Sequence, residues 1–156
     1  MKRINHALGL LLLVILVGFT GCELPTVYES EPNNERSNAN TFHLGTHKGD
    51  IFPAEDVDVW AINVSGDGKT HTFTLSNMYT NLQMLLYVCD YYNNNLDPSE
   101  LPAGVVLPIT AYQESNINEQ VSFTANTACR LIIQIEEAGD TIVSETGSYW
   151  LTHDSE

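Results

Sequence analysis

Short stretches in which apolar residues occupy every second position constrain the fold most strongly. In the first of them, Trp60, Ile62 and Val64 lie on one face of an extended segment, and the turn sequence SGDG follows directly. Past the apolar run near the N-terminus, no segment of ten or more residues shows the periodicity of an amphipathic helix. Strands are expected at residues 60–64, 70–75, 82–88, 105–109, 120–124, 129–136 and 148–153. This spacing predicts an all-β chain that folds as a β-sandwich.

Length and charge limit the classes of function. The chain has 156 residues, which is room for one ordinary domain, and it carries 20 Asp and Glu against 6 Lys and Arg, a formal net charge of −14. A phosphate backbone would be repelled by this excess of acid, so nucleic-acid binding is not expected. A hydrophobic content of 43%, with 2 Trp, 7 Tyr and 5 Phe, indicates a packed core rather than a disordered chain.

The first residues have the pattern of a secretory signal peptide. Two basic residues, Lys2 and Arg3, precede an apolar run at 7–19. As a helix this run would be about 20 Å long, shorter than the roughly 30 Å hydrocarbon core of a bilayer. A short membrane span or a buried core helix is the alternative interpretation.

Residues 18–22 read GFTGC and resemble a bacterial lipobox, in which a small residue precedes the cysteine that receives lipid, although Phe19 stands where Leu is usual. The resemblance implies that Cys22 becomes the first mature residue and carries acyl chains, each buried CH₂ contributing about 0.8 kcal/mol to membrane binding. We therefore expect a protein of the bacterial cell envelope, periplasmic or surface-exposed, and anchored to the membrane through Cys22. An ordinary structural cysteine is the alternative.

Composition divides the rest of the chain. The stretch before the first alternating strands is polar and rich in Asn, Glu, Ser and Thr, which is typical of a tether. The expected organisation is a lipoprotein signal peptide at 1–21, an acidic and polar tether with a metal-binding segment at 22–47, and the β-sandwich at 48–156.

Two cysteines remain in the expected mature domain. Cys89 and Cys129 lie on expected strands, in LLYVCDYY and ACRLIIQIE, and an exported protein meets conditions that permit disulfides. A bridge would close a loop of about 40 residues and add roughly 3–4 kcal/mol of stability. Two separate buried thiols are the alternative, and the sequence leaves both open.

Acidic residues gather in two groups at the N-terminal side of the expected sandwich. Glu29 and Glu31 are two residues apart, so they project the same way from an extended chain, and Asp56 and Asp58 do likewise just before Trp60. Hard divalent cations take six to eight oxygen ligands, and two such pairs brought together would need a cation to offset their repulsion. A solvated acidic face is the alternative.

The order of these motifs resembles the bacterial pre-peptidase C-terminal domain family. The matching elements are E-x-E-P-N-N at 29–34, a glycine, D-x-D before an aromatic strand, LLYVCD at 85–90 and GSYWLT at 147–152. The resemblance implies a jelly-roll-like antiparallel β-sandwich that is not itself catalytic and usually accompanies secreted proteases. Collagen-binding domains of clostridial collagenases are similar, and their N-terminal segment holds calcium.

The resemblance also implies a set of calcium ligands. Glu29 and Glu31 match paired glutamates of the calcium-binding segment, while Asn34 stands where members that bind calcium often carry Asp. The full set of expected metal ligands is Glu29, Glu31, Asn33, Asn34, Asp50, Glu55, Asp56 and Asp58.

We expect a binding or accessory module rather than an enzyme, because the sequence contains no GxSxG, HExxH or phosphate-binding glycine motif. One alternative is a surface adhesin that binds a glycan or matrix protein through Tyr91, Tyr92 and Tyr112. Another is a structural subunit of an envelope complex.

Overall fold

The computed structural model describes residues 25–43, 45–53, 55–78, 81–111, 118–138 and 147–156. The expected signal peptide, the lipidation site Cys22 and one expected ligand-face residue, Tyr112, lie outside the described residues. Within the described ranges, no helix has the length and apolar character needed to cross a bilayer.

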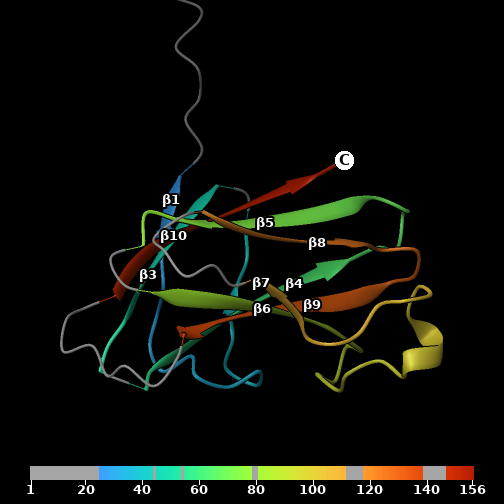
Figure 1. The fold of residues 1–156 in the computed structure, drawn as a ribbon, viewed down its shortest axis with the longest axis horizontal. Coiled ribbons are helices and arrows are strands. Elements are labelled where there is room, and N and C mark those ends of the chain that lie inside the picture. Colours follow the sequence, from blue (N-terminus) through green and yellow to red (C-terminus); the bar gives the residue numbers. More distant parts are fainter. Residues whose placement is uncertain (1–24, 44, 54, 79–80, 112–117, 139–146) are drawn as a thin grey trace, which may run out of the picture.

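Two five-stranded sheets pack face to face (Figure 1). The strands are β1 (Thr26–Tyr28), β2 (Asn40–Thr41), β3 (Thr46–Ile51), β4 (Val57–Val64), β5 (Thr70–Ser76), β6 (Leu82–Cys89), β7 (Ile109–Ala111), β8 (Glu119–Thr124), β9 (Cys129–Glu137) and β10 (Gly147–Ser155). A short 3₁₀ helix, η1, spans Pro98–Glu100. The first sheet has the order β1-β3-β10-β5-β8 and the second β2-β4-β9-β6-β7. The predicted β-sandwich is confirmed.

Most predicted strands are present, and the exceptions have local causes. Strand β3 lacks an apolar alternation, because two of its inward positions are His47 and Gly49. The expected strand at 105–109 is wrong, since β7 begins only at Ile109. Pro108 has no backbone N–H to donate to a neighbouring strand. Val105 and Leu107 instead pack against the core from a loop.

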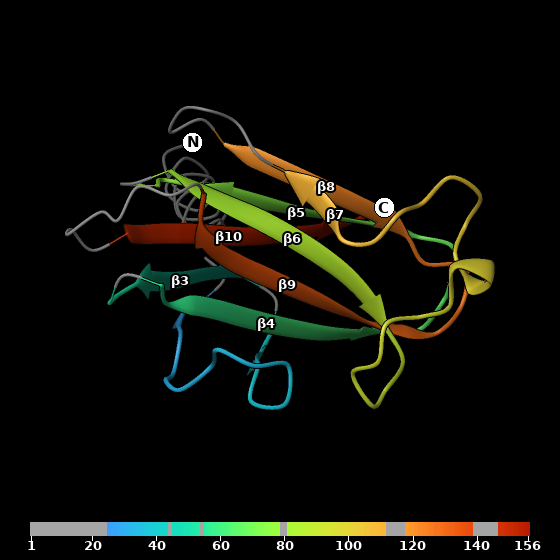
Figure 2. The same ribbon diagram turned by 60° about the horizontal axis from the view of Figure 1, so that its bottom comes forward.

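The sheets are mixed rather than purely antiparallel, which corrects the expectation. β1 pairs with β3 in parallel, and β2 pairs with β4 in parallel. The chain between β1 and β2, residues 29–39, crosses from the first sheet to the second, and we name it the strap. Figure 2 shows it beside β4. The segment expected as a tether therefore supplies the first edge strand of each sheet. Alternation of apolar residues cannot reveal that these strands pair in parallel.

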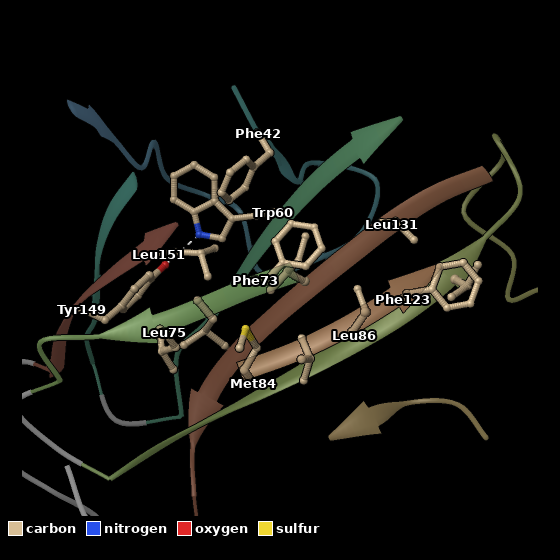
Figure 3. Close-up of a cluster of buried hydrophobic side chains, with 14 of the residues drawn as sticks. Phe42, Trp60, Phe73, Leu75, Met84, Leu86, Phe123, Leu131, Tyr149 and Leu151 are labelled. Atoms are coloured by element: carbon tan, nitrogen blue, oxygen red, sulfur yellow. Dashed lines mark hydrogen bonds between the residues drawn. The ribbon is translucent and has the colours of Figure 1, made fainter. Parts of the chain in front are cut away.

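Inward-facing residues of both sheets form one core. Trp60, Phe73 and Tyr149 are completely buried, and Leu86 and Leu131 pack with them (Figure 3). Each large apolar side chain that is fully buried contributes about 1.5–3 kcal/mol. The Trp60 indole Nε1 donates a 2.8 Å hydrogen bond to the Tyr149 hydroxyl, so the largest core residue has a partner for its only polar atom.

A second apolar layer lies on the outer face of the second sheet. Val59, Ala61, Cys89 and Ile132 are buried there, and Ala39, the last residue of the strap, packs against them. This layer explains why β4, β6 and β9 are apolar on both faces.

The disulfide left open by the sequence is not formed. Both cysteines are free and buried. Cys89 belongs to the outer apolar layer, whereas Cys129 belongs to the core between the sheets. Their side chains therefore leave opposite faces of the same sheet, and no bridge can join them without turning a strand over.

Candidate metal centre

Three carboxylates from two parts of the chain, the strap and β4, converge where the strap leaves the first sheet. Oxygens of Glu29, Glu31 and Asp58 lie within 4.8 Å of one another. The pairing of β1 positions the first of them, because the Glu29 N–H donates to the Lys48 carbonyl at 2.9 Å and so extends the ladder by one residue. The third comes from β4, on the same inward face as Trp60.

Asp58 is completely buried, and its two oxygens differ in their surroundings. Oδ2 accepts a 2.6 Å hydrogen bond from the Tyr149 hydroxyl, which in turn accepts from Trp60. Oδ1 has no hydrogen-bond donor. Burial, and then the neighbouring Glu29 carboxyl, raise the pKa of Asp58 to about 9, so without a cation this group holds a proton at neutral pH.

Glu29 presents its free oxygen to the same place. Its Oε1 accepts a 2.7 Å hydrogen bond from the Asp50 N–H, while Oε2 is buried without a donor. Burial raises the pKa of Glu29. A carboxylate oxygen can only accept, so Glu29 Oε2 and Asp58 Oδ1 can share either a proton or a cation.

Gly49 gives these groups their room. A Cβ atom at this position would collide with the Tyr149 hydroxyl and with Glu29 Oε2. No residue with a side chain can occupy this point of β3 while the carboxylate and the phenol keep their places.

Asn33 supplies a second, independent sign of a ligand. Its side chain is fully buried, and neither its amide oxygen nor its amide nitrogen has a hydrogen-bond partner. Its backbone N–H donates to Glu31 Oε2 at 3.0 Å, so the residue lies directly beside the acidic cluster. Because a buried amide left unpaired costs about 1–3 kcal/mol, this position fits an oxygen donor that meets an ion.

No basic side chain neutralises the cluster. Among the described residues the only ion pair joins Lys69 and Asp67, which lie on a distant turn. The donors gathered at the cluster are carboxylate and amide oxygens, with no sulfur or imidazole among them. This set suits a hard divalent cation and not a softer one that prefers thiolate or imidazole ligands.

The structure does not bring all predicted ligands into the cluster. Asp56 accepts from the Asn34 amide at 2.6 Å and from the N–H groups of Phe52 and Val57 at 3.0 and 2.9 Å, so it closes the turn before β4. The side chain of the predicted ligand Asn34 is therefore bonded to this turn. Two further predicted ligands are exposed: Asp50, and Glu55, which has φ 75°.

The predicted tyrosine face is partly described. Tyr91 and Tyr92 are 55% and 85% exposed. They lie on a tight turn after β6, where Asp90 Oδ1 accepts from the N–H groups of Tyr92 and Asn94 at 2.8 and 2.9 Å.

Sequence reasoning missed Tyr149 as part of the centre. Its signal was the GSYWLT strand, in which the tyrosine falls on the inward, apolar face and so needs a partner for its hydroxyl. Gly49 was seen only as a matched glycine, without its role in making room.

Fold and site together define an all-β sandwich in which an acidic cluster lies between the N-terminal strap and the second sheet. We name this cluster, Glu29, Glu31 and Asp58, the clasp. A scan against models of protein families finds no match to the chain, and a search of curated proteins finds none. Solved structures do show similar folds. The pre-peptidase C-terminal domain of collagenase from Bacillus anthracis aligns with a TM-score of 0.52 at 15% identity, covering 81% of this chain and all of that domain.

A periplasmic inhibitor of g-type lysozyme from Aeromonas hydrophila aligns with a TM-score of 0.47 at 14% identity, covering 86% of this chain and 98% of the inhibitor. The expected resemblance to pre-peptidase C-terminal domains is confirmed for the fold.

Proposed function

We propose that this chain is an exported bacterial lipoprotein whose β-sandwich is clasped by calcium and serves as a non-catalytic binding or accessory module. One observation supports the clasp above all others. Oxygens of Glu29, Glu31 and Asp58 converge within 4.8 Å, and buried oxygens among them lack any donor.

The ion would add a link between two elements that already meet through hydrogen bonds, one of them from the Val59 N–H to the Asn33 carbonyl at 3.1 Å. Glu29, Glu31 and Asn33 belong to the strap, and Asp58 belongs to β4 in the opposite sheet. Ligation would therefore fix the strap across the edge of the sandwich. An extracellular module with a Kd of about 0.1–1 mM gains about 1.4 kcal/mol when the free ion is at ten times Kd.

Calcium suits these ligands better than magnesium. The donors come from the strap, which has no regular secondary structure, and from a strand, and Glu31 at the surface leaves room for water. Calcium accepts irregular cages of six to eight oxygens, whereas magnesium demands near-octahedral geometry and keeps most of its water.

The accessory role is supported by the address and by the fold. Glu29 stands seven residues after Cys22, so acylation of Cys22 would hold the clasp close to the membrane. The similar domain of the anthrax collagenase is called a pre-peptidase C-terminal domain, which is an appended module. We therefore place the sandwich outside the cytoplasm as a module that presents a binding surface.

Thermal unfolding tests the clasp. The mature chain with Cys22→Ser would be melted in millimolar calcium, in millimolar magnesium and in chelator. Calcium should raise the melting midpoint by several degrees, since about 1 kcal/mol shifts the midpoint of a domain of this size by about 2–8 °C. Asp58→Asn should abolish that rise. Asp50→Asn removes an exposed acid of the same region and should keep it, because its side chain points to solvent. An unchanged midpoint in calcium would end the proposal.

A further inference from the structure

Two exposed aromatic residues and a lysine form a row across the outer face of the first sheet. The strand register places Tyr28 of β1 beside Lys48 of β3, Lys48 beside Trp150 of β10, and Trp150 beside Ser76 of β5. Tyr28 is 70% and Trp150 42% exposed. These strands are consecutive neighbours in the first sheet (Figure 1).

The lysine holds both rings in place. Lys48 Nζ lies 4.5 Å from the centre of the Trp150 ring and 5.8 Å from that of Tyr28, which are cation–π distances. Lys48 therefore covers the side of the indole that faces β3. On the other side stands Ser76, a small residue whose hydroxyl donates to the Trp150 carbonyl at 3.4 Å. The part of the indole left exposed thus borders β5.

Neutral hydroxyl and amide side chains cover the part of this face that runs from Trp150 to Asp154. They are Thr46, Thr70, Thr72, Thr74, Ser76, Gln120, Ser122, Thr124 and Thr152. Several pair across strands: Thr72 with Ser122 at 2.9 Å, and Gln120 Nε2 with Thr74 at 3.2 Å. In a chain with 20 acidic residues, this stretch of surface is free of charge until Asp154.

The hydroxyl-covered stretch ends in a hollow. It has a volume of about 420 Å³ and is lined by Thr70, Thr72, Gln120, Asp154, Ser155 and Glu156. Trp150 and Asp154 lie on the same face of β10, four residues apart, which is roughly 13 Å along a strand. A continuous path therefore leads from the aromatic row to the hollow.

This combination of groups matches the surface of a sugar. A pyranose ring with equatorial substituents has an apolar face of C–H groups that can lie on an aromatic ring, and a rim of hydroxyls that exchange hydrogen bonds with Thr, Gln and Asp. An anionic ligand would need free cations here, but Lys48 is engaged by two rings. A hydrophobic peptide would need an apolar stripe, and past Trp150 the path is polar.

We infer that the outer face of the first sheet binds a neutral oligosaccharide of two or three β-linked pyranose units. One unit stacks on Trp150 beside Ser76, the next lies over Thr74 and Thr152, and the far end enters the hollow, where Asp154 and Gln120 accept and donate hydrogen bonds. This site is separate from the turn that carries Tyr92.

The clasp reaches this site through one residue, and this part of the inference rests on the proposed function. Tyr28 directly precedes Glu29, so an ion bound at Glu29 would fix β1 and hold Tyr28 beside Lys48. Trp150 lies on β10, a central strand, and none of the hydroxyl-bearing residues is among the three clustered carboxylates, so this part of the site does not need the ion. Calcium should therefore strengthen binding only by the share that Tyr28 contributes, a factor of about two to five.

Fluorescence offers a direct test, because the chain has two tryptophans and Trp60 is completely buried. The mature chain with Cys22→Ser would be titrated to millimolar concentrations with cellotetraose and with chitotetraose, and with α-linked maltotetraose for comparison. At least one β-linked sugar should change the tryptophan emission, and calorimetry should give the same affinity. Trp150→Ala should weaken binding by at least about tenfold without lowering the melting midpoint, whereas Tyr92→Ala should leave affinity unchanged.

Four results would overturn the inference: no binding of either β-linked sugar, binding that survives in Trp150→Ala, binding that is lost in Tyr92→Ala, or self-association through Trp150 in place of sugar binding. Failure of the clasp has a different signature. Glu31→Gln would then leave the melting midpoint in calcium unchanged, while sugar binding and its dependence on Trp150 would persist.

Discussion

The Tyr149 hydroxyl donates to Asp58 at 2.6 Å and accepts from Trp60 at 2.8 Å, so one phenol joins the acidic cluster to the centre of the core. The three residues are fully buried. Because the phenol lies between the sheets, anything that changes the charge of Asp58 acts directly on core packing. The clasp and the fold are in this sense one structure.

Tyr149→Phe should therefore lower the free energy of unfolding by more than the loss of a hydroxyl at the surface does. The change leaves Trp60 Nε1 without an acceptor and Asp58 Oδ2 without a donor, and each buried polar group left unpaired costs about 1–3 kcal/mol. Urea unfolding in calcium should show a loss of about 2–4 kcal/mol. Tyr91→Phe, on an exposed turn, is the matched control and should be neutral. A neutral result for Tyr149→Phe would mean that the hydrogen-bond chain is not formed.

The metal-free protein should lose stability as the pH rises from 7 to 9. The pKa of Asp58 is raised to about 9 in the folded state and lies near 4 in the unfolded chain. The folded state thus holds a proton that the unfolded state has released, so this contribution is full below pH 4 and is lost as the pH approaches 9. His47, His71 and His153 do not interfere in this window, because burial lowers the pKa of each of them, that of His47 to about 4.

Melting in chelator at pH 7, 8 and 9 measures this slope, and Asp58→Asn should flatten it. With saturating calcium the slope should flatten, because the ion displaces the proton from Asp58, and the ion-bound folded state and the unfolded state then hold the same number of protons over this range. A metal-free protein that gains stability over this range would contradict the prediction.

Gly49→Ala should remove the calcium response. The added methyl would meet the Tyr149 hydroxyl and Glu29 Oε2, so at least one of them must move away from the centre. We expect a loss of about 1–3 kcal/mol in chelator and no rise of the midpoint in calcium. Gly104→Ala is the control for backbone effects. Gly104 has φ 88° and open space around it, so its substitution should cost about 1 kcal/mol and keep the calcium response.

Arg36 should act as a second attachment of the strap. Its guanidinium lies 4.1 Å over the Tyr87 ring, and Nη1 donates to Asn95 Oδ1 at 2.6 Å and to the Asn93 carbonyl at 3.3 Å. Arg36→Ala should destabilise the protein by about 1–2 kcal/mol, and Arg36→Lys should recover only part of this, because lysine lacks the planar fork. Both variants should keep the calcium-dependent rise in melting midpoint. Equal stability of the alanine variant and the parent would show that the strap is held without Arg36.

The sequence predicted the sandwich because its central strands bury a face in the core. Such a face appears in the sequence as apolar residues at every second position, as in Leu131, Ile133 and Ile135. It could not show that the strap covers the second sheet, since Ala39 and the outer residues of β4 give the same apolar signal as a core. The clasp was predicted only in part. Paired spacing identified Glu29, Glu31 and Asp58, but Asp56 has the same spacing and is used by a turn.

The two thiols of the folded domain should be free and unreactive. Cys89 and Cys129 leave opposite faces of their sheet, and burial raises the pKa of both thiols, that of Cys129 to about 11. Because the thiolate is the reactive form, a thiol reagent should modify neither residue at neutral pH until the chain unfolds. The Cys22→Ser chain, purified without reductant, should then release two thiol equivalents in denaturant. Cys129→Ala should be the costlier substitution, since it leaves a cavity between the sheets, and the recovery of no free thiol in denaturant would show that the strand faces are assigned wrongly.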